Sequence, residues 1–197
     1  MAENIRTMHL IYFASNNKNK YREIKSWVTK SALNLKFAQL MLTEIQADLI
    51  DNIAIEKAKD AFLKVSKPVL VEDDGLFINS LNGFPGQYSS FIFKTIGNPG
   101  ILKLLAKCSN RSASFISVVV FCNRTNIRAF RAQVTGQISQ VVTEGGWGYD
   151  PIFIPDGVTR TYGQLHLQNR KSLFSHRIRA FEKFLKWYNK ARVTSKA

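Results

Sequence analysis

Three consecutive acids, Glu72, Asp73 and Asp74, are the clearest candidates for chemistry, because they close an otherwise apolar run. Adjacent carboxylates repel one another unless a cation or a proton relieves the repulsion. Their hard oxygen atoms suit Mg²⁺, which usually takes one or two carboxylates together with substrate phosphates. The acids therefore predict a magnesium site. The alternative is that they cap a loop that begins at Gly75.

A second candidate is the polar segment SNNKNK, which contains Ser15, Asn17 and Lys20 and separates an apolar run from an amphipathic stretch. A turn here would direct backbone N–H groups, a hydroxyl, an amide and an ammonium to one point. The N-terminus of the following helix would add roughly half a positive charge. This pattern favours a phosphate-binding turn, and the alternative is a helix cap with surface lysines.

Two further groups lie in the last third of the chain. Trp147, Tyr149 and Asp150 share a Gly- and Pro-rich segment, where aromatic rings can stack on a base and a carboxylate can accept from its N–H edge. Lys171, His176 and Arg177 lie before or at the start of the last helix and could bind a phosphate or a keto oxygen. The alternatives are aromatic residues that cover a core edge and an ordinary helix cap.

The elements that must position these groups show both helical and extended patterns, which together predict an α/β fold with an antiparallel meander in its second half. We expect strands over 10–15, 69–73, 114–123, 128–134 and 137–142, with turns at 123–126 and at Thr135-Gly136. We expect helices after SNNKNK, over 51–65, from Asn98-Pro99 as cap and first residue, and from about Ser175, and a shaped loop over 82–89.

Composition sets the broad class. The chain has 197 residues, of which 45% are hydrophobic and 21% charged, as in ordinary globular proteins. Two cysteines and three histidines exclude a disulfide-rich scaffold, a four-cysteine zinc site and histidine-rich metal clusters. No apolar run approaches the about 18 residues of a membrane span, and the first residues lack the apolar core of a signal peptide. A cytoplasmic protein with no membrane partner is predicted.

The charge is the unusual quantity, with 28 Lys and Arg against 14 Asp and Glu and a formal net charge of +14. Such a balance attracts phosphates in a nucleotide, a nucleic acid or an anionic membrane surface. The basic residues crowd towards the C-terminus, where 189–197 is expected to be a loose tail. Because no zinc-finger, RNP or basic-zipper pattern is present, nucleic acid is not expected as a main partner, although a non-catalytic nucleic-acid-binding protein stays an alternative.

In chain order, the candidate groups resemble the inosine triphosphate pyrophosphatase family, also called Ham1-like. The resemblance runs from about Leu10 to Tyr188. The matching segments are SNNKNK followed by Arg22-Glu23, EDDGL at 72–76, NGFPGQYS at 82–89, GWGYDPIF at 146–153, TYGQL with Tyr162 and Gln164, and RKSLFSHR at 170–177.

The resemblance implies one domain over 1–197, with an elongated mixed central sheet flanked by helices and two lobes around a substrate cleft. It implies a homodimer that hydrolyses non-canonical purine nucleoside triphosphates (ITP, dITP, XTP) to monophosphate and pyrophosphate with Mg²⁺, or Mn²⁺ in its place. A sister activity on the same fold, a Maf-like pyrophosphatase acting on pyrimidine or modified nucleotides, is the nearest alternative, and the GWGYDP and SHR segments argue against it.

The same resemblance assigns roles to single residues. Asp73 would activate the attacking water. Ser15, Asn17, Lys20 and Lys57 would hold the phosphates; Glu44, Glu72 and Asp73 would bind the metal; and Trp147, Tyr149, Asp150, Lys171, His176 and Arg177 would form the base pocket, the last two donating to the purine 6-keto oxygen.

Three positions depart from the family pattern. Asp74 takes a place usually held by Ser or Thr and adds negative charge beside the metal site. Phe91 stands where bacterial members commonly have Arg, so no catalytic role is expected there. Ser172 replaces an Asn after Lys171.

Overall fold

The computed structural model describes residues 10–28 and 33–194, which form an α/β fold. The first part comprises β1 (Leu10–Ser15), α1 (Lys18–Val28), β2 (Asn34–Gln39), α2 (Ile50–Val65) and β3 (Val69–Ile78). The middle comprises η1 (Asn79–Leu81), β4 (Pro85–Gly86), α3 (Ser89–Thr95) and α4 (Gly97–Leu104). The last part comprises β5 (Ser112–Cys122), β6 (Ile127–Ile138), β7 (Phe153–Pro155), α5 (Tyr162–Leu167), η2 (Lys171–Leu173) and α6 (His176–Thr194).

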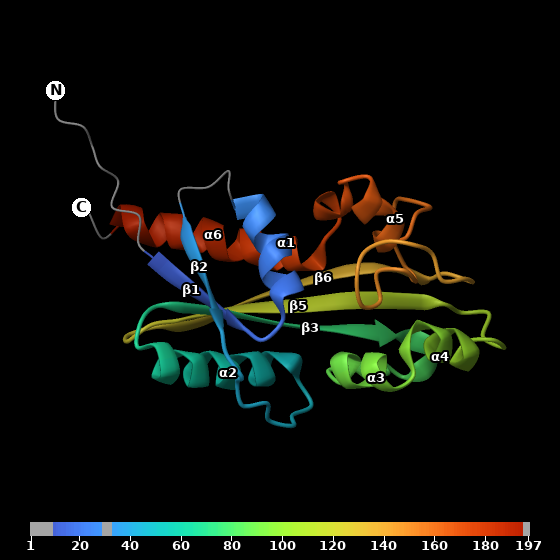
Figure 1. Ribbon diagram of the computed structural model, residues 1–197, viewed down its shortest axis with the longest axis horizontal. Helices are drawn as coiled ribbons and strands as arrows, with labels where there is room; N and C mark the ends of the chain where they lie inside the picture. Colours follow the sequence, from blue (N-terminus) through green and yellow to red (C-terminus); the bar gives the residue numbers. More distant parts are fainter. Residues whose placement is uncertain (1–9, 29–32, 195–197) are drawn as a thin grey trace.

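The described strands form one mixed sheet with the order β2-β1-β3-β5-β6-β7, and β4 pairs with β3 off this path. β1 is parallel to β2 and β3, whereas β3, β5 and β6 are long antiparallel neighbours. These long strands give the molecule its elongated shape, with β1, β2 and α2 towards one end and α3, α4 and α5 towards the other (Figure 1). The fold is therefore the predicted elongated mixed sheet with two lobes.

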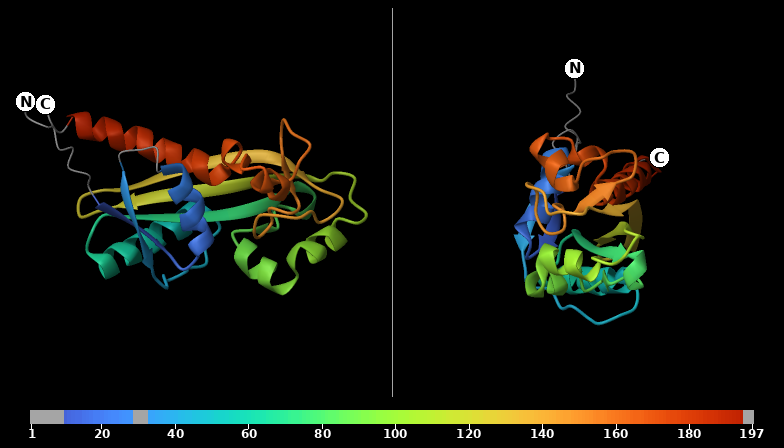
Figure 2. Two further views of the ribbon diagram at one scale, coloured as in Figure 1. Left: turned by 45° about the horizontal axis from the view of Figure 1, so that its top comes forward. Right: turned by 90° about the vertical axis from the view of Figure 1, so that its right-hand side faces the viewer.

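Helices cover both faces of the sheet (Figures 1 and 2). In α2 the buried residues recur at helical spacing and include three alanines, Ala54, Ala58 and Ala61, which let the helix pack closely on β3 and β5. On the opposite face, α6 and α1 pack over a core rich in aromatic residues, such as Phe181 and Phe184. A third cluster lies in the other lobe and surrounds Phe115, Phe153 and Tyr162.

The sheet has an open edge in the middle of β3. Among the described residues, β1 pairs with β3 at Val69 and Leu70, and β4 pairs with it at Leu76 and Phe77. Positions 71–75 of β3 thus have no strand neighbour on that side, and the chain leaves β1 at Ser15 beside this gap. Polar side chains from both faces can meet there, because no strand separates them.

Three sequence expectations about strands are wrong. β3 does not end at the three acids: it continues to Ile78, because β5 pairs with it along its whole length. Gly75 therefore lies inside a strand, where a Cβ would overlap the carbonyl oxygen of Gly86. Likewise, Thr135-Gly136 is not a turn, because β6 runs unbroken to Ile138 and Gly136 allows β7 to approach. Residues 139–142 are not a strand.

Two expectations about helix ends also need correction. Asn98 does not cap α4, which begins at Gly97; its side-chain amide donates instead to the Gly148 carbonyl at 3.0 Å. α6 extends to Thr194, so most of the predicted tail is helical, and 195–197 lie outside the described residues. The two cysteines are free thiols, and no described helix is long and apolar enough to cross a membrane.

Candidate active site

A cavity of about 740 Å³ lies at the open edge of β3. It is lined by residues from β1, α1, the segment before α2, α2, β3, α3, the 145–151 loop and α6. All of the predicted site residues line it except Lys171, which is buried behind the wall. Segments that are far apart in the sequence therefore converge on one cavity, as the phosphate, metal and base assignments together require.

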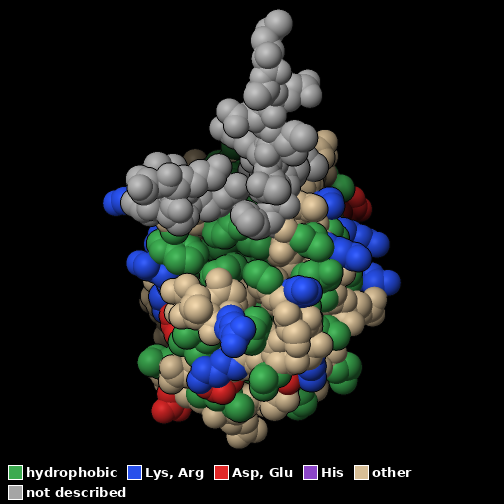
Figure 3. Space-filling model, turned by 90° about the vertical axis from the view of Figure 1, so that its left-hand side faces the viewer, with side chains coloured by type: hydrophobic (Ala, Val, Ile, Leu, Met, Phe, Trp, Pro, Cys, Tyr) green, Lys and Arg blue, Asp and Glu red, His purple; other side chains and the backbone are tan. Residues whose placement is uncertain are grey.

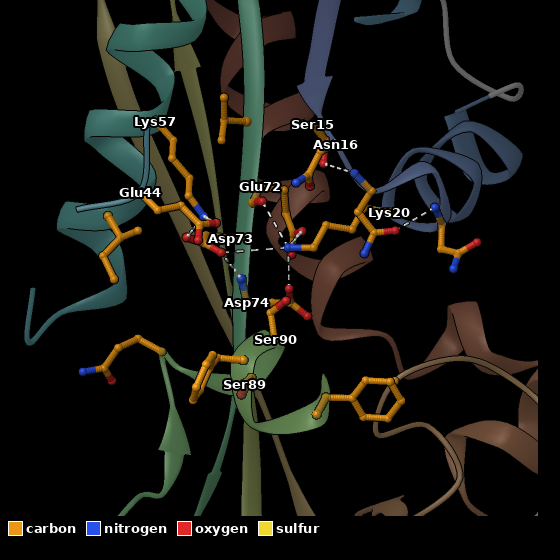
Figure 4. Close-up of a pocket in the computed structure, with 18 of the residues that line it drawn as sticks. Ser15, Asn16, Lys20, Glu44, Lys57, Glu72, Asp73, Asp74, Ser89 and Ser90 are labelled. Carbon is orange, nitrogen blue, oxygen red and sulfur yellow. Dashed lines mark hydrogen bonds and ion pairs between the residues drawn. The ribbon is translucent and has the colours of Figure 1, made fainter. Parts of the chain in front are cut away.

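The alternation of β3 directs its three acids to different sides. Val69 and Val71 belong to the core cluster under α2, whereas Leu70 faces α1 and α6. Successive side chains on a strand point to opposite faces, so Asp73 is directed towards α2, and Glu72 and Asp74 towards α1 and α6. Figure 4 shows the three carboxylates along β3 with a lysine on either side.

On the α2 side, the ammonium of Lys57 lies between two carboxylates, at 2.8 Å from Asp73 Oδ2 and 2.6 Å from Glu44 Oε1. Lys57 is held by α2, while the Glu44 side chain is 70% exposed on the segment between β2 and α2. Burial raises the pKa of Asp73 although Lys20 and Lys57 oppose it. A carboxyl group with a raised pKa is a better proton acceptor when ionised, which suits the predicted role of Asp73.

On the α1 side, Lys20 Nζ contacts all three acids, at 2.5 Å from Asp74 Oδ1, 3.1 Å from Glu72 Oε2 and 3.9 Å from Asp73 Oδ1. Burial alone would lower the pKa of Lys20, but the three carboxylates outweigh it, so its pKa is raised and the ammonium stays charged. Lys20 is thus a buried cation at the cavity wall and not a surface lysine.

The turn before α1 is also a helix cap. Asn17 Oδ1 accepts from the backbone N–H of Asn19 at 2.9 Å, and Ser15 Oγ accepts from that of Asn17 at 3.0 Å. Asn17 thus acts as a helix cap, as the alternative interpretation of this segment expects, because its side chain satisfies one of the open donors of the first helical turn. The capped turn still borders the cavity with Ser15 and Asn17.

Arg177, at the start of α6, is paired with three acids. Its Nη1 donates to Glu23 Oε2 at 2.7 Å, its Nη2 to Asp74 Oδ2 at 2.8 Å, and its Nε lies 3.1 Å from Glu72 Oε2. Burial would lower the pKa of Arg177, yet these carboxylates raise it well above its ordinary value. Its neighbour His176 is buried against the ring of Phe115, and burial lowers the pKa of His176, although its hydrogen bond with Asp74 opposes this shift.

The loop over 145–151 forms another wall of the cavity. Asp150 Oδ2 accepts from the backbone N–H of Trp147 at 3.0 Å and from Lys171 Nζ at 2.8 Å, which fixes the loop. The Trp147 ring has Arg177 at 5.0 Å and Lys171 at 5.4 Å from its centroid, as in cation–π contacts. Tyr149 is buried and its hydroxyl donates to the Ser89 carbonyl, so it joins this loop to α3.

Glu23 is a site residue to which sequence reasoning gave no role. Its side chain is mostly buried, accepts from Ser175 Oγ at 2.5 Å and Lys171 Nζ at 3.0 Å, and pairs with Arg177. Its position three residues after Lys20 was an available signal, because residues so spaced share a helix face. Ser117 was also missed. It donates to Glu72 Oε1 at 2.6 Å. This contact depends on the register between β3 and β5, which no local sequence pattern reveals.

The carboxylates around the cavity are the side chains that could hold a divalent ion. Within the described part of the chain, no three His, Cys, Asp or Glu side chains form a metal-binding group by themselves. Mg²⁺, however, needs one or two carboxylates when phosphates supply other ligands. The side chains that ion pairs join around the cavity include more carboxylates than cations, and this excess negative charge fits an added cation. The carboxylates are those of Glu23, Glu44, Glu72, Asp73, Asp74 and Asp150, and the cations are those of Lys20, Lys57, Lys171 and Arg177.

Comparisons with known proteins agree with this arrangement. A model of the Ham1 family matches residues 11–187. The chain belongs to the Ham1 family. It is 44% identical over 165 residues to the dITP/XTP pyrophosphatase of Korarchaeum cryptofilum, covering 84% of this chain and 88% of that protein. It is 42% identical over 180 residues to the dITP/XTP pyrophosphatase of Methanopyrus kandleri, covering 90% and 95%.

The fold of this Ham1 family member is also similar to solved structures. A HAM1 protein from Coxiella burnetii superposes with a TM-score of 0.79 at 28% identity, covering 93% of this chain and all of that one. The Staphylococcus aureus Ham1 protein gives the same TM-score at 26% identity, covering 92% and 99%. The predicted family and the predicted fold class are therefore confirmed.

Proposed function

We propose that this protein hydrolyses non-canonical purine nucleoside triphosphates (ITP, dITP and XTP) to the nucleoside monophosphate and pyrophosphate. The observation that carries the proposal is the convergence of Lys20, Asp73 and His176 on one cavity in a chain whose relatives are named dITP/XTP pyrophosphatases. The reaction would remove deaminated purine nucleotides from the nucleotide pool.

Asp73 is the proposed general base. Its carboxylate would take the proton from the water that attacks the α-phosphorus, directly or through a second water, while the bond to the leaving pyrophosphate breaks. The raised pKa of Asp73, caused by burial, supports this assignment. Lys57 contacts Asp73 and would both orient its carboxylate and stabilise charge on the phosphate chain.

Lys20 and the capped turn at Ser15 and Asn17 would hold the phosphate chain at the N-terminus of α1. Glu44, Glu72 and Asp73 would hold Mg²⁺, or Mn²⁺, which takes the same oxygen ligands. A bound divalent ion would neutralise phosphate charge and lower the pKa of a water molecule that it binds.

Lys20→Ala is predicted to raise KM for ITP more than it lowers kcat, and an unchanged KM would contradict the phosphate-binding assignment.

The base would lie against Trp147, with Arg177 as a donor to the 6-keto oxygen. His176, when both ring nitrogens carry a proton, would be a second donor through Nδ1, which has no hydrogen-bond partner among the described residues. Each terminal nitrogen of Arg177 keeps a second hydrogen beyond the one donated to Glu23 or Asp74. Adenine presents an amino group at the same place, so buried donors would face a donor, and such a mismatch costs orders of magnitude in kcat/KM. Lys171, which does not line the cavity, would act by fixing Asp150 and Glu23.

Three features extend this proposal beyond the site. We propose a homodimer as the working assembly, a cytoplasmic location, and one functional domain over residues 1–197 whose two lobes hold the substrate between them. The elongated sheet with helices at both ends supports the two-lobe organisation.

The experiment that tests the function is incubation with ITP, XTP, GTP, dTTP and ATP in the presence of Mg²⁺, followed by separation of the products. Pyrophosphate from ITP and XTP, with little from ATP, is the expected result. Turnover of dTTP in preference to ITP would favour the Maf-like activity. No turnover together with salt-sensitive DNA retention would favour a nucleic-acid-binding protein.

A further inference from the structure

Asp74 lies at the junction between the phosphate and base regions of the cavity. One carboxylate oxygen contacts Lys20 at 2.5 Å, and the other contacts Arg177 at 2.8 Å and His176 at 3.4 Å. It lines the cavity, and its side chain is 15% exposed. No step of the proposed reaction uses it.

The contact of Asp74 with Lys20 is the shortest that this ammonium makes. The others are 3.1 Å to Glu72 Oε2, 3.3 Å to the Glu72 carbonyl oxygen and 3.9 Å to Asp73. Charge-assisted contacts of this length are the strong ones. A phosphate oxygen that binds Lys20 must share the ammonium with this carboxylate and approach a like charge at short range. Asp74 therefore opposes the binding of an anion to the ammonium of Lys20.

Asp74 is also fixed in place. The guanidinium of Arg177 holds its second oxygen, and Arg177 is itself buried and paired with Glu23 and Glu72. Because these contacts anchor the carboxylate from the α6 side, it stays beside Lys20 when an anion arrives. Asp73, in contrast, is offset by Lys57, at 2.8 Å.

We propose that Asp74 is an internal anion that competes with the phosphate chain for Lys20 and thereby weakens retention of the pyrophosphate product. The proposal rests on the function proposed for the cavity. Its consequence is a site in which a triphosphate binds through base and phosphates together, whereas pyrophosphate, which lacks the base, is held weakly and leaves.

The test is the dissociation constant of pyrophosphate measured by calorimetry in metal-free buffer. Asp74→Asn removes the charge and keeps the size of the side chain and one acceptor oxygen. Asp74→Ser removes the charge and also shortens the side chain, so that its oxygen lies farther from Lys20. Asp156→Asn is the matched control, because Asp156 is an exposed acid outside the cavity and the change alters the net charge equally. We expect the dissociation constant to fall at least about tenfold in both Asp74 variants, given the strength of a charge pair at this distance, and to stay unchanged in the control.

Unchanged or weaker pyrophosphate binding in Asp74→Asn would overturn the proposal, since Asp74 would then hold Lys20 in place for the anion and not compete with it. If Asp74→Ser does not fold, Asp74→Asn decides. Turnover of ITP by the unaltered protein is measured separately. Turnover with unchanged pyrophosphate affinities rejects this inference alone, whereas no turnover of ITP rejects the proposed function.

Discussion

At the scale of single residues, the site is a network of buried opposite charges in which each cation contacts more than one acid. Lys57 bridges Asp73 and Glu44, and Arg177 bridges three carboxylates. Removing one member of such a network leaves its buried partners with fewer opposite charges, and the loss is largest for a group that has no second partner. For a substitution in this network, both activity and the free energy of unfolding must be measured, because only the two together distinguish a chemical role from a structural one.

Asp73→Asn tests the general base. The amide keeps the shape of the side chain, and Lys57 keeps Glu44 as a partner, so we expect the fold to persist. Loss of a general base typically costs about 10²–10⁴-fold in rate, and we expect a fall in kcat for ITP in that range. Steady-state kinetics and a thermal melt measure the two effects, and a variant with near-normal kcat would remove Asp73 from this role.

Glu23→Gln tests the buried network through its pH dependence. Burial would raise the pKa of Glu23, but Arg177 and Lys171 lower it far below its ordinary value of 4.5. A depressed pKa contributes stability that is present above about pH 4.5 and is lost as pH falls towards the pKa of the folded state. We expect Glu23→Gln to cost about 3–5 kcal/mol at pH 7 in urea unfolding, with a smaller difference as pH falls below 4.5. A constant difference across that range would contradict the assignment.

At the scale of elements, local patterns predicted α1, α2, α6 and the long strands, because each has a clear apolar periodicity. They failed where tertiary contacts decide the structure, as in the extension of β3 along β5 and the passage of β6 through Gly136. β2 and β7 are an edge strand and a strand of three residues, with too little pattern to predict. α5 carried a signal that was overlooked, the capping box between Thr161 and Gln164.

The candidate site was largely predictable as a set of residues but not as a network. Motifs placed Lys20, Asp73 and Arg177 in one cavity. The contacts of Glu23 with Lys171, Ser175 and Arg177 join α1 to α6 and the turn before it across most of the chain, and no local spacing encodes such contacts. The order in which acids and lysines alternate around β3 likewise depends on the sheet register.

Gly146→Ala tests how the 145–151 loop positions the base pocket. Gly146 has a φ of +69°, and a Cβ there would lie 2.5 Å from both Cβ and Oδ2 of Asp150. The added methyl would displace Asp150 from Lys171 and Trp147, so we expect a higher KM for ITP and a loss of about 1–3 kcal/mol in stability. Gly157→Ala is the control, because Gly157 has a similar φ of +84° with nothing within 4 Å. Equal KM values for the two variants would show that the loop does not position the base.

At the scale of the whole molecule, we expect the net charge of +14 to favour the approach of an anionic substrate. Figure 3 shows Lys and Arg side chains spread over one end of the molecule among hydrophobic and other side chains, with few acids between them. A positive surface raises the local concentration of a polyanion over a range set by the ionic strength. Five of the 14 acids instead line the cavity, where each is paired with a lysine or arginine: Glu44, Glu72, Asp73, Asp74 and Asp150.

This distribution predicts that kcat/KM for ITP falls as NaCl is raised from about 0.01 to 0.3 M, because the Debye length then shrinks from about 30 Å to less than 8 Å. We expect the change mainly in KM, since paired buried groups are screened less than the surface. Initial rates over this salt range measure it, with potassium glutamate in place of NaCl as a check on chloride binding. A kcat/KM that does not respond to salt would show that surface charge plays no part in substrate capture.

In the proposed reaction, water attacks the α-phosphorus of a purine triphosphate bound along the open edge of β3. Hydrolysis of ITP in ¹⁸O-labelled water, followed by mass spectrometry of both products, tests it most directly. We predict that one labelled oxygen is found in the inosine monophosphate and none in the pyrophosphate. Label in the pyrophosphate, or orthophosphate as the product, would place the attack at another phosphorus and contradict the account.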